Sequence, residues 1–186
     1  MNGCISAAPL RSRSWSESST GRADRCGSLN AEAARVVREL ALEPHPEGGY
    51  YREVFRSPQT VVTTNGDSRS ALTVIYFLLA DRQVSTWHRL RSDETWHFAS
   101  GDELEIDLLQ DAANATTLNL GPSGPYAVAI PAGLPFAARL RSGTGFALVT
   151  CCVAPGFEFE DFEMLDAAAL MRAYPNCADT IASYAR

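Results

Sequence analysis

The sequence predicts an all-β fold, a sandwich or barrel of short strands, with one helix before it and one after it along the chain. Between residues 50 and 153, short apolar or alternating runs are separated by Gly, Pro, Asn or Ser, which is the usual pattern of an all-β domain. The runs number about ten, close to a jelly roll with extensions. Apolar residues at helical spacing are found outside this region, at 31–41 and 167–174.

The first 29 residues are rich in Ser, Arg and Gly and contain few large apolar side chains. This composition predicts a disordered leader at 1–29, and residues 30–186 have the length of a single domain. The leader lacks the apolar core of a secretory signal, and no stretch of the sequence is long and apolar enough to span a membrane. We therefore expect no membrane partner.

A helix is expected over 31–41, because Asn30 is a favourable N-cap and the apolar residues that follow form one stripe. Pro44 and Pro46 end this helix and extend the chain, and Gly48-Gly49 permits backbone angles that other residues avoid. The result is a sharply shaped loop that leads into a strand ending near residue 56.

The remaining strands follow in order, each bounded by turn residues. We expect them at 61–64, 71–79, 104–108, 116–120, 126–130, 134–139 and 145–153. Asn65-Gly66 after the first of these indicates a hairpin. The run 71–79 is continuously apolar and is expected to be covered on both faces, whereas 104–108 alternates with acidic residues and should have one wet face.

The C-terminal region alternates again after Pro155-Gly156, with phenylalanines at 157, 159 and 162 in the sequence F-E-F-E-D-F-E, and ends in a helix stopped by Pro175. These phenylalanines need burial, which either the chain's own barrel or that of a partner chain would supply.

The stretch 85–101 contains two of the three histidines, two of the three tryptophans and several acidic residues. We expect two strands here, joined by the short polar hairpin loop Arg91-Ser92-Asp93. Side chains alternate between the faces of a strand. If the aromatic face points inward, His88 and Glu94 project together into an apolar interior and His97 points away.

Composition limits the function. A net charge of −6 and a pI near 5.1 argue against a nucleic-acid groove, which relies on clustered positive charge, so a small or neutral partner is expected. The chain contains no lysine, which excludes Schiff-base chemistry through a lysine amine. Five cysteines without metal-ligand or C-x-x-C spacing indicate structural thiols in a reducing, cytoplasmic compartment.

Four ordered blocks resemble the cupin-like family of unknown function known as cupin family five. They are P-H-P-E-G-G-Y-Y-R-E at 44–53, S-T-W-H-R-L-R-S-D-E-T-W-H-F-A-S-G-D at 85–102, I-P-A-G-L-P-F-A-A at 130–138 and V-A-P-G-F-E-F-E-D-F-E at 153–163. The resemblance implies a cupin-type jelly-roll β-barrel of the RmlC-like kind, usually a homodimer, with a ligand-sized cavity at the barrel mouth.

The same resemblance also bears on cofactors. In metal-binding cupins the first motif carries H-x-H, a glutamate and a glycine; here His88, Glu94 and Gly101 match, but Leu90 occupies the position of the second histidine. Phe136 replaces the histidine of the second motif. Two donors are too few for a tight Zn²⁺ or Fe²⁺ site, so we expect no cofactor, and a divalent metal is disfavoured.

The first hypothesis is therefore a small-molecule-binding protein with a metal-free pocket. The residues expected around this pocket are Glu47, Tyr50, Arg52, His88, Glu94, Trp96, Phe98 and Phe136. Few polar groups among aromatic side chains are typical of ligand sites.

Three alternatives stay open at this point. The first is a metal-independent isomerase or epimerase of the RmlC-like type acting on a carbohydrate-like substrate, with His88, Glu94 and Tyr50 as its catalytic residues and Tyr51 or Tyr126 as other candidate acids. The second is a metal-dependent cupin enzyme. In the third, His88 and Glu94 form a buried hydrogen-bonded pair without a site.

Overall fold

Alternating and continuous apolar runs form thirteen strands in the computed structural model, which describes residues 29–111 and 114–185. The predicted disordered leader lies outside these residues except for Leu29, which packs beside the first helix. The strands are β1 (Glu43–Pro44), β2 (Tyr50–Arg56), β3 (Thr60–Val62), β4 (Ser68–Ser70), β5 (Thr73–Ala80), β6 (Val84–Leu90), β7 (Asp93–Gly101), β8 (Leu104–Leu109), β9 (Ala115–Leu120), β10 (Ala127–Ile130), β11 (Phe136–Leu140), β12 (Phe146–Ala154) and β13 (Phe162–Met164). The helices are α1 (Ala31–Glu39), α2 (Ala167–Ala173) and α3 (Ala178–Ala182), with 3-10 turns η1 (Phe159–Asp161) and η2 (Pro175–Cys177).

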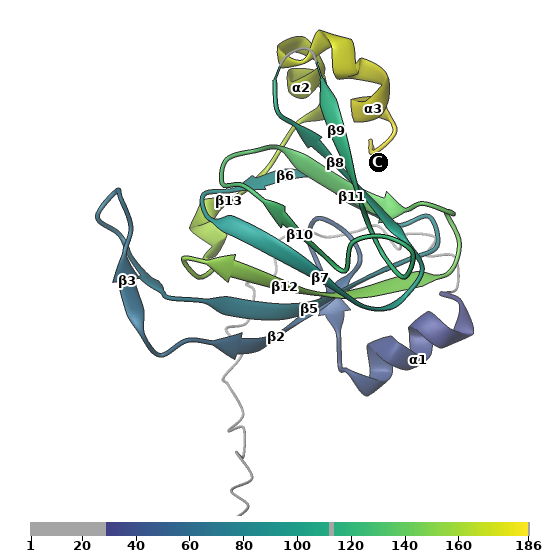
Figure 1. Cartoon of the computed structure of the whole chain (residues 1–186), viewed down its shortest axis with the longest axis horizontal. Coiled ribbons are helices and arrows are strands. Elements are labelled where there is room, and N and C mark those ends of the chain that lie inside the picture. Colours follow the sequence, from purple (N-terminus) through teal and green to yellow (C-terminus); the bar gives the residue numbers. More distant parts are fainter. Residues whose placement is uncertain (1–28, 112–113, 186) are drawn as a thin grey trace, which may run out of the picture.

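Most of the strands belong to two antiparallel sheets that pack face to face as a jelly roll (Figure 1). One sheet has the order β1-β2-β5-β12-β7-β10 and the other has the order β13-β6-β11-β8-β9. Their inner faces supply the main core, which includes Phe77, Trp96, Ile106, Phe136 and Val149. The predicted all-β jelly roll with flanking helices is confirmed.

The predicted hairpin between the two strands of residues 85–101 is wrong. β6 belongs to the five-stranded sheet, where it pairs with β11 and β13, and β7 belongs to the six-stranded sheet, where it pairs with β12 and β10. The short connection at Arg91-Ser92 therefore crosses from one sheet to the other. A short polar loop fits either geometry, and the crossing makes side chains of β6 and β7 face each other across the interior.

Helix α1 covers part of the outer face of the six-stranded sheet. The Asn30 side chain accepts a hydrogen bond from the Ala33 amide at 2.8 Å, which confirms the predicted N-cap. Ala33 and Val36 of the helix pack against Leu78 of β5. Because Leu78 faces α1 while Phe77 faces the interior, β5 is buried on both faces, as its continuous apolar sequence predicts.

Strands β3 and β4 form the predicted hairpin around Asn65-Gly66, and Figure 1 shows it projecting from the side of the jelly roll. Its base is tied to the C-terminal segment, because the buried Arg69 guanidinium makes a two-pronged ion pair with the Asp161 carboxylate, with Nε–Oδ2 and Nη2–Oδ1 distances of 2.6 and 3.2 Å.

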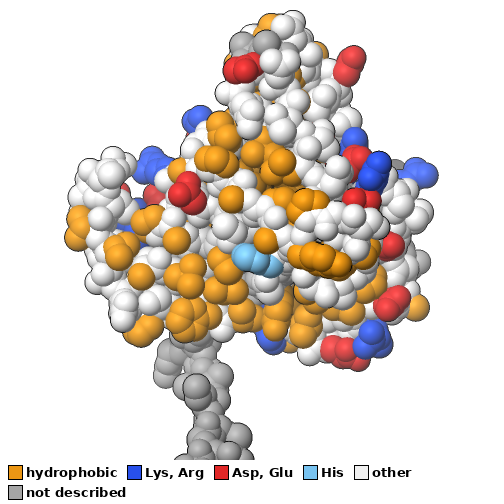
Figure 2. Space-filling view, in the orientation of Figure 1, with side chains coloured by type: hydrophobic (Ala, Val, Ile, Leu, Met, Phe, Trp, Pro, Cys, Tyr) orange, Lys and Arg blue, Asp and Glu red, His pale blue; other side chains and the backbone are white. Residues whose placement is uncertain are grey.

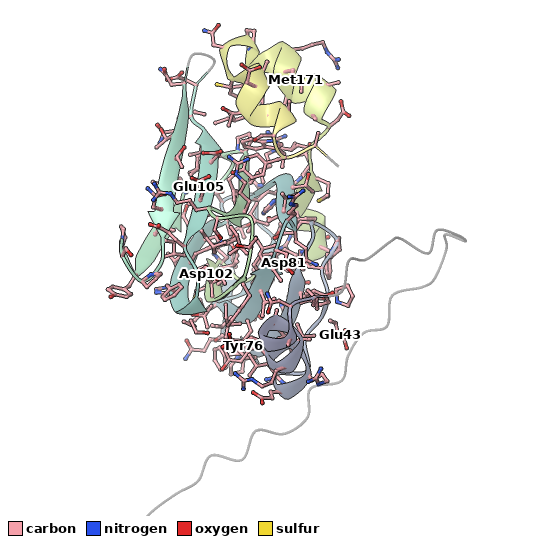
Figure 3. The ribbon with its side chains drawn as sticks, turned by 90° about the vertical axis from the view of Figure 1, so that its right-hand side faces the viewer. Glu43, Tyr76, Asp81, Asp102, Glu105 and Met171 are labelled. Atoms are coloured by element: carbon pink, nitrogen blue, oxygen red, sulfur yellow. The ribbon has the colours of Figure 1, made fainter. Side chains whose placement is uncertain are left out.

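The C-terminal helices cover the outer face of the five-stranded sheet, at the end of the molecule opposite α1. Figure 3 shows Met171 of α2 at this end and Tyr76 of β5 near α1. The Trp87 indole donates to the Ile181 carbonyl, and the Tyr184 hydroxyl donates to Asp107 of β8. The predicted wet face of β8 is thus wrong at Asp107, which these helices bury.

The alternating C-terminal segment breaks at η1 and resumes as β13, which pairs with β6 of its own sheet. Phe162 packs on the His88 ring with a centroid distance of 5.4 Å, and Phe157 packs on Phe162 at 6.0 Å. Two of these phenylalanines are therefore accommodated by the chain's own jelly roll.

Candidate functional site

Four titratable side chains from separate parts of the chain meet inside the jelly roll: His45 and Glu47 from the loop before β2, His88 from β6 and Glu94 from β7. All four are buried, with side chains or whole residues no more than 7 % exposed. We refer to these four residues as the interior cluster. Buried ionisable groups are costly unless they are paired, so their partners determine what the cluster can do.

The loop that carries His45 and Glu47 depends on glycine. Gly48 and Gly49 have φ values of 119° and 70°, in the region that side chains disfavour. A Cβ on Gly49 would lie 2.5 Å from the Leu78 carbonyl oxygen. The Glu47 carbonyl accepts from the Thr86 amide at 2.9 Å, so the loop is fixed directly against β6.

His88 and Glu47 lie in contact. Nδ1 of His88 lies 2.7 Å from the Thr86 carbonyl; since a carbonyl only accepts, Nδ1 carries a hydrogen. Nε2 of His88 lies 3.2 Å from Oε2 of Glu47, so the ring would form an ion pair with this carboxylate when it is protonated. Ser85 donates to the other carboxyl oxygen at 2.9 Å.

Glu94 faces this pair from the opposite sheet. Burial is the main cause that raises the pKa of its carboxyl to about 7; His88 opposes the rise, Glu47 adds to it, and Trp96 and Cys151 oppose it. The carboxyl therefore changes charge close to neutral pH. The Trp96 indole nitrogen is near this carboxyl but lacks the geometry of a hydrogen bond; it is the one buried side-chain nitrogen or oxygen without a hydrogen-bond partner within residues 29–111 and 114–185.

The two imidazoles are neutral at neutral pH. Burial lowers the pKa of His45 to about 3, with a contribution from the adjacent His88. Burial also lowers the pKa of His88, against the opposing effects of the Thr86 carbonyl and Glu94. Glu94, with a pKa of about 7, therefore changes charge around neutral pH, whereas the two imidazoles stay neutral there.

Aromatic rings surround the cluster. The His45 ring lies edge-on to Tyr51 and Phe77, with centroid distances of 4.6 and 5.9 Å. Phe136 is the neighbour of His88 on β11, with centroids 4.0 Å apart, and Phe162 lies within 6.0 Å of both imidazoles. Polar groups converging within aromatic walls are the usual composition of a ligand site.

Five of the eight predicted pocket residues come together in this interior. Glu47, His88 and Glu94 belong to the cluster, and Trp96 and Phe136 are part of the core around it. Phe98 lies further along the inner face of β7, where it packs near Tyr126 at the rim. The predicted outward orientation of His97 is confirmed, since its side chain is exposed and contacts the neighbouring Thr95 hydroxyl.

Tyr50 and Arg52 do not reach the cluster, which corrects their predicted placement. Tyr50 packs with α1 on the outer face of the six-stranded sheet, and the Arg52 guanidinium lies over the Tyr76 ring on that same face. Tyr51, one residue along, points inward instead. The register of β2 is set by the glycine loop before it, so the alternation within the strand did not show which tyrosine is inside.

His45 is the main residue that sequence analysis missed. The signal was present in the spacing P-H-P-E, because a histidine two residues before Glu47 reaches the same carboxyl when the loop folds back: His45 Nδ1 and Glu47 Oε2 are 3.6 Å apart. Phe162 was also missed as a wall of the cluster, because its approach to His88 depends on the pairing of β13 with β6.

The cluster does not fit a metal ion. No group of three or more His, Cys, Asp or Glu side chains among the residues with described positions is arranged to hold one. Nδ1 of His88 and Oε1 of Glu47 already take part in hydrogen bonds to Thr86 and Ser85, and Leu90 and Phe136 provide no donor atoms.

A surface cavity of about 610 Å³ lies elsewhere, between the start of α1 and the turns at Asp81, Asp102 and Gly145 (Figure 3). Its polar groups satisfy one another, since Asp81 accepts from the Asn30 and Gly145 amides and Asp102 accepts from the Phe146 amide. It holds none of the predicted pocket residues.

Two facing antiparallel sheets with an imidazole–carboxyl cluster between them define a protein of the cupin class. The family model described as Cupin superfamily (DUF985), Cupin_5, matches residues 34–165. The chain belongs to this family.

Solved structures agree with this assignment. A hypothetical protein from Leishmania major is 35% identical, with a TM-score of 0.77, over 82% of this chain and 98% of that one. A protein from Shewanella oneidensis is 34% identical, with a TM-score of 0.75, over 86% and 99%. Oxalate decarboxylase from Bacillus subtilis is similar in fold alone, at 15% identity and a TM-score of 0.50 over 76% of this chain and 37% of that one. No curated protein matches the chain.

Proposed function

We propose that this protein binds a small molecule at the interior cluster and does so without a bound metal ion. The observation that carries the proposal is the meeting of Glu47, His88 and Glu94 from a loop and two sheets within aromatic walls. If these residues had a purely structural role, apolar side chains would stabilise the fold better, because buried ionisable pairs seldom add net stability.

Access to the cluster requires movement of a covering segment. Phe162 of β13 covers the two imidazoles, and β13 is only three residues long. Short edge strands open more readily than central ones. We propose that the ligand enters when β13 separates from β6.

The direct test is native mass spectrometry of the full chain purified without chelator. We expect a retained organic molecule that is lost in Glu94→Gln and kept in Glu39→Gln, a change to an exposed carboxylate on α1. Elemental analysis of the same sample should give substoichiometric metal. Stoichiometric metal that is lost in Glu94→Gln would contradict the metal-free site and favour a metal-dependent cupin enzyme.

A second candidate is a metal-independent isomerase or epimerase. The 3.2 Å contact between Nε2 of His88 and Oε2 of Glu47 favours it, because an imidazole beside a carboxyl can take and return a proton from a bound substrate. Tyr51, which faces the interior, replaces Tyr50 as the candidate acid. Turnover of a carbohydrate-like substrate that survives His88→Gln unchanged would exclude this mechanism.

We further propose that the protein is a homodimer in the cytoplasm. Hydrophobic side chains are spread over the outer face of the six-stranded sheet beyond α1 (Figure 2). Light scattering on the full chain tests the dimer. The three cysteines that the structure describes, Cys151, Cys152 and Cys177, are free thiols, which supports a reducing compartment.

A further inference from the structure

The charge of the interior cluster limits what it can bind. Nε2 of His88 lies 3.2 Å from the Glu47 carboxyl, and within residues 29–111 and 114–185 no arginine forms an ion pair with the second carboxyl, Glu94. The one arginine buried among the described residues is Arg69, whose guanidinium is bound to Asp161 near the base of the β3–β4 hairpin. Every basic residue of the chain is an arginine, so a lysine cannot fill this role.

An anion is therefore a poor ligand for this interior. A carboxylate or phosphate group would bring negative charge beside Glu47 and Glu94 at low dielectric, where like charges repel strongly. Proteins that bind such groups provide arginine, lysine or a helix N-terminus, and none of these is among the described side chains that surround the cluster.

The walls favour a cation. Tyr51 and Phe77 flank His45, and Phe136 and Phe162 flank His88. The faces of aromatic rings attract organic cations, most strongly when water is excluded. A ring of aromatic side chains beside a buried carboxyl is the arrangement that recognises ammonium groups.

A second observation concerns hydrogen bonding around Glu94. The Trp96 indole N–H is buried beside this carboxyl and has no hydrogen-bond partner in the part of the chain that the structure describes. An unpartnered buried N–H costs about 1–3 kcal/mol. Small shifts of Glu94 on binding a ligand would let its carboxylate accept from this N–H and from the ligand together.

We infer that the interior cluster takes a small organic cation, in its simplest form a protonated primary amine, held by the Glu94 carboxylate, Nε2 of His88 and the aromatic rings. This inference rests on the proposed function and specifies its ligand. Binding is coupled to proton release, because a cation stabilises the ionised form of Glu94, whose carboxyl is largely protonated in the free protein below neutral pH.

Three probes of nearly equal size and shape separate the charge classes: isobutylammonium, isobutanol and isobutyrate. Binding of each to the full chain is measured by calorimetry at pH 6 and pH 8. We expect isobutylammonium to bind most tightly, with tighter binding at pH 8 and a proton released at pH 6. Glu94→Gln should weaken it by at least about tenfold, the cost of losing a charged hydrogen bond, and Glu39→Gln should not change it.

Two results would overturn the inference while leaving the proposed function intact: isobutanol or isobutyrate binding as tightly as the amine, or amine binding that survives in Glu94→Gln. Absence of binding by all three probes would overturn it as well. The proposed function would then depend on the mass-spectrometric test, which needs no assumption about charge.

Discussion

Oε2 of Glu47 lies 3.2 Å from Nε2 of His88, while the other nitrogen of that imidazole is bonded to the Thr86 carbonyl. A glutamate in a loop before β2 thus meets the ring of a histidine in β6. The pairing is possible because the loop folds against β6 through the Thr86 amide.

Replacing His88 should destabilise the protein. His88→Gln removes the imidazole that lies 3.2 Å from the buried Glu47 carboxyl, and loss of a contact to a buried charged group costs about 1–3 kcal/mol in the free energy of unfolding. His97→Gln is the matched control, because His97 is exposed on β7. This variant should change stability by less than about 0.5 kcal/mol. Urea denaturation of both variants measures the difference; equal costs would contradict the buried pair.

The tautomer of His88 can be observed directly. Nitrogen-15 NMR of histidine-labelled protein should show Nδ1 protonated, and the ring should remain neutral at pH values well below 6.5, because burial lowers the pKa of His88. His97 provides the exposed reference within the same spectrum. A His88 ring protonated at Nε2 alone would contradict the bond to the Thr86 carbonyl.

Glu94 should give stability a distinct pH dependence. Its pKa is raised from 4.5 to about 7 in the folded protein, so the folded state binds the proton more tightly and the free energy of unfolding falls as pH rises from about 4.5 to about 7. His45, whose pKa is lowered from 6.5 to about 3, acts in the opposite direction between those two values. The Glu94 contribution is therefore isolated as a difference between variants.

In Glu94→Gln this fall should disappear. Relative to wild type, the variant should gain stability between pH 4.5 and 7 by up to about 3 kcal/mol, since one pKa unit corresponds to about 1.4 kcal/mol. Chemical denaturation across this range measures the gain. A difference between the two proteins that does not vary with pH would show that Glu94 is ionised throughout.

The loop before β2 should not tolerate a side chain at Gly49. Gly49→Ala combines a φ of +70° with a Cβ placed 2.5 Å from the Leu78 carbonyl oxygen, and we expect a loss of at least about 2 kcal/mol. Gly66→Ala has a similar φ of +88° but open space around the Cβ, so it should cost only about 1 kcal/mol. Thermal unfolding of the two variants separates the clash from the backbone strain.

Removing the ring of Phe162 should open the interior. Phe162→Ala is expected to accelerate hydrogen exchange of the buried Trp96 indole N–H, because the Phe162 ring covers the imidazoles of the interior cluster. Phe159→Ala, at an exposed ring of the preceding turn, is the control and should leave the exchange rate unchanged. Identical rates in both variants would mean that access does not pass through β13.

Alternation along single strands predicted the inner faces of β6 and β7 correctly: His88, Glu94 and Trp96 are inside and His97 is outside. This works because period two is a local property of an extended chain. Tyr50 was wrongly predicted to face the interior in place of Tyr51. Which residues of β2 face inward is fixed by the glycine loop before it and by pairing with β5, and both lie outside the strand itself.

Other features depend on contacts that no local pattern encodes. The position of His45 beside Glu47 requires the loop to fold back, and the burial of Asp107 requires helices from the end of the chain. The length of the Arg91-Ser92 connection is compatible with a hairpin and with a crossing, so strand pairing alone distinguishes them. The resemblance to the cupin-like family supplied the fold, which the family match confirms.

Because Arg91-Ser92 carries the chain from one sheet to the other, His88 and Glu94 are held at their distance by the packing of the two layers and not by strand hydrogen bonds. Swelling of the space between the layers would pull the imidazole and the carboxyl apart while every strand stayed paired. On warming or in dilute denaturant, ligand binding at the interior cluster should therefore be lost before circular dichroism shows any loss of β-structure.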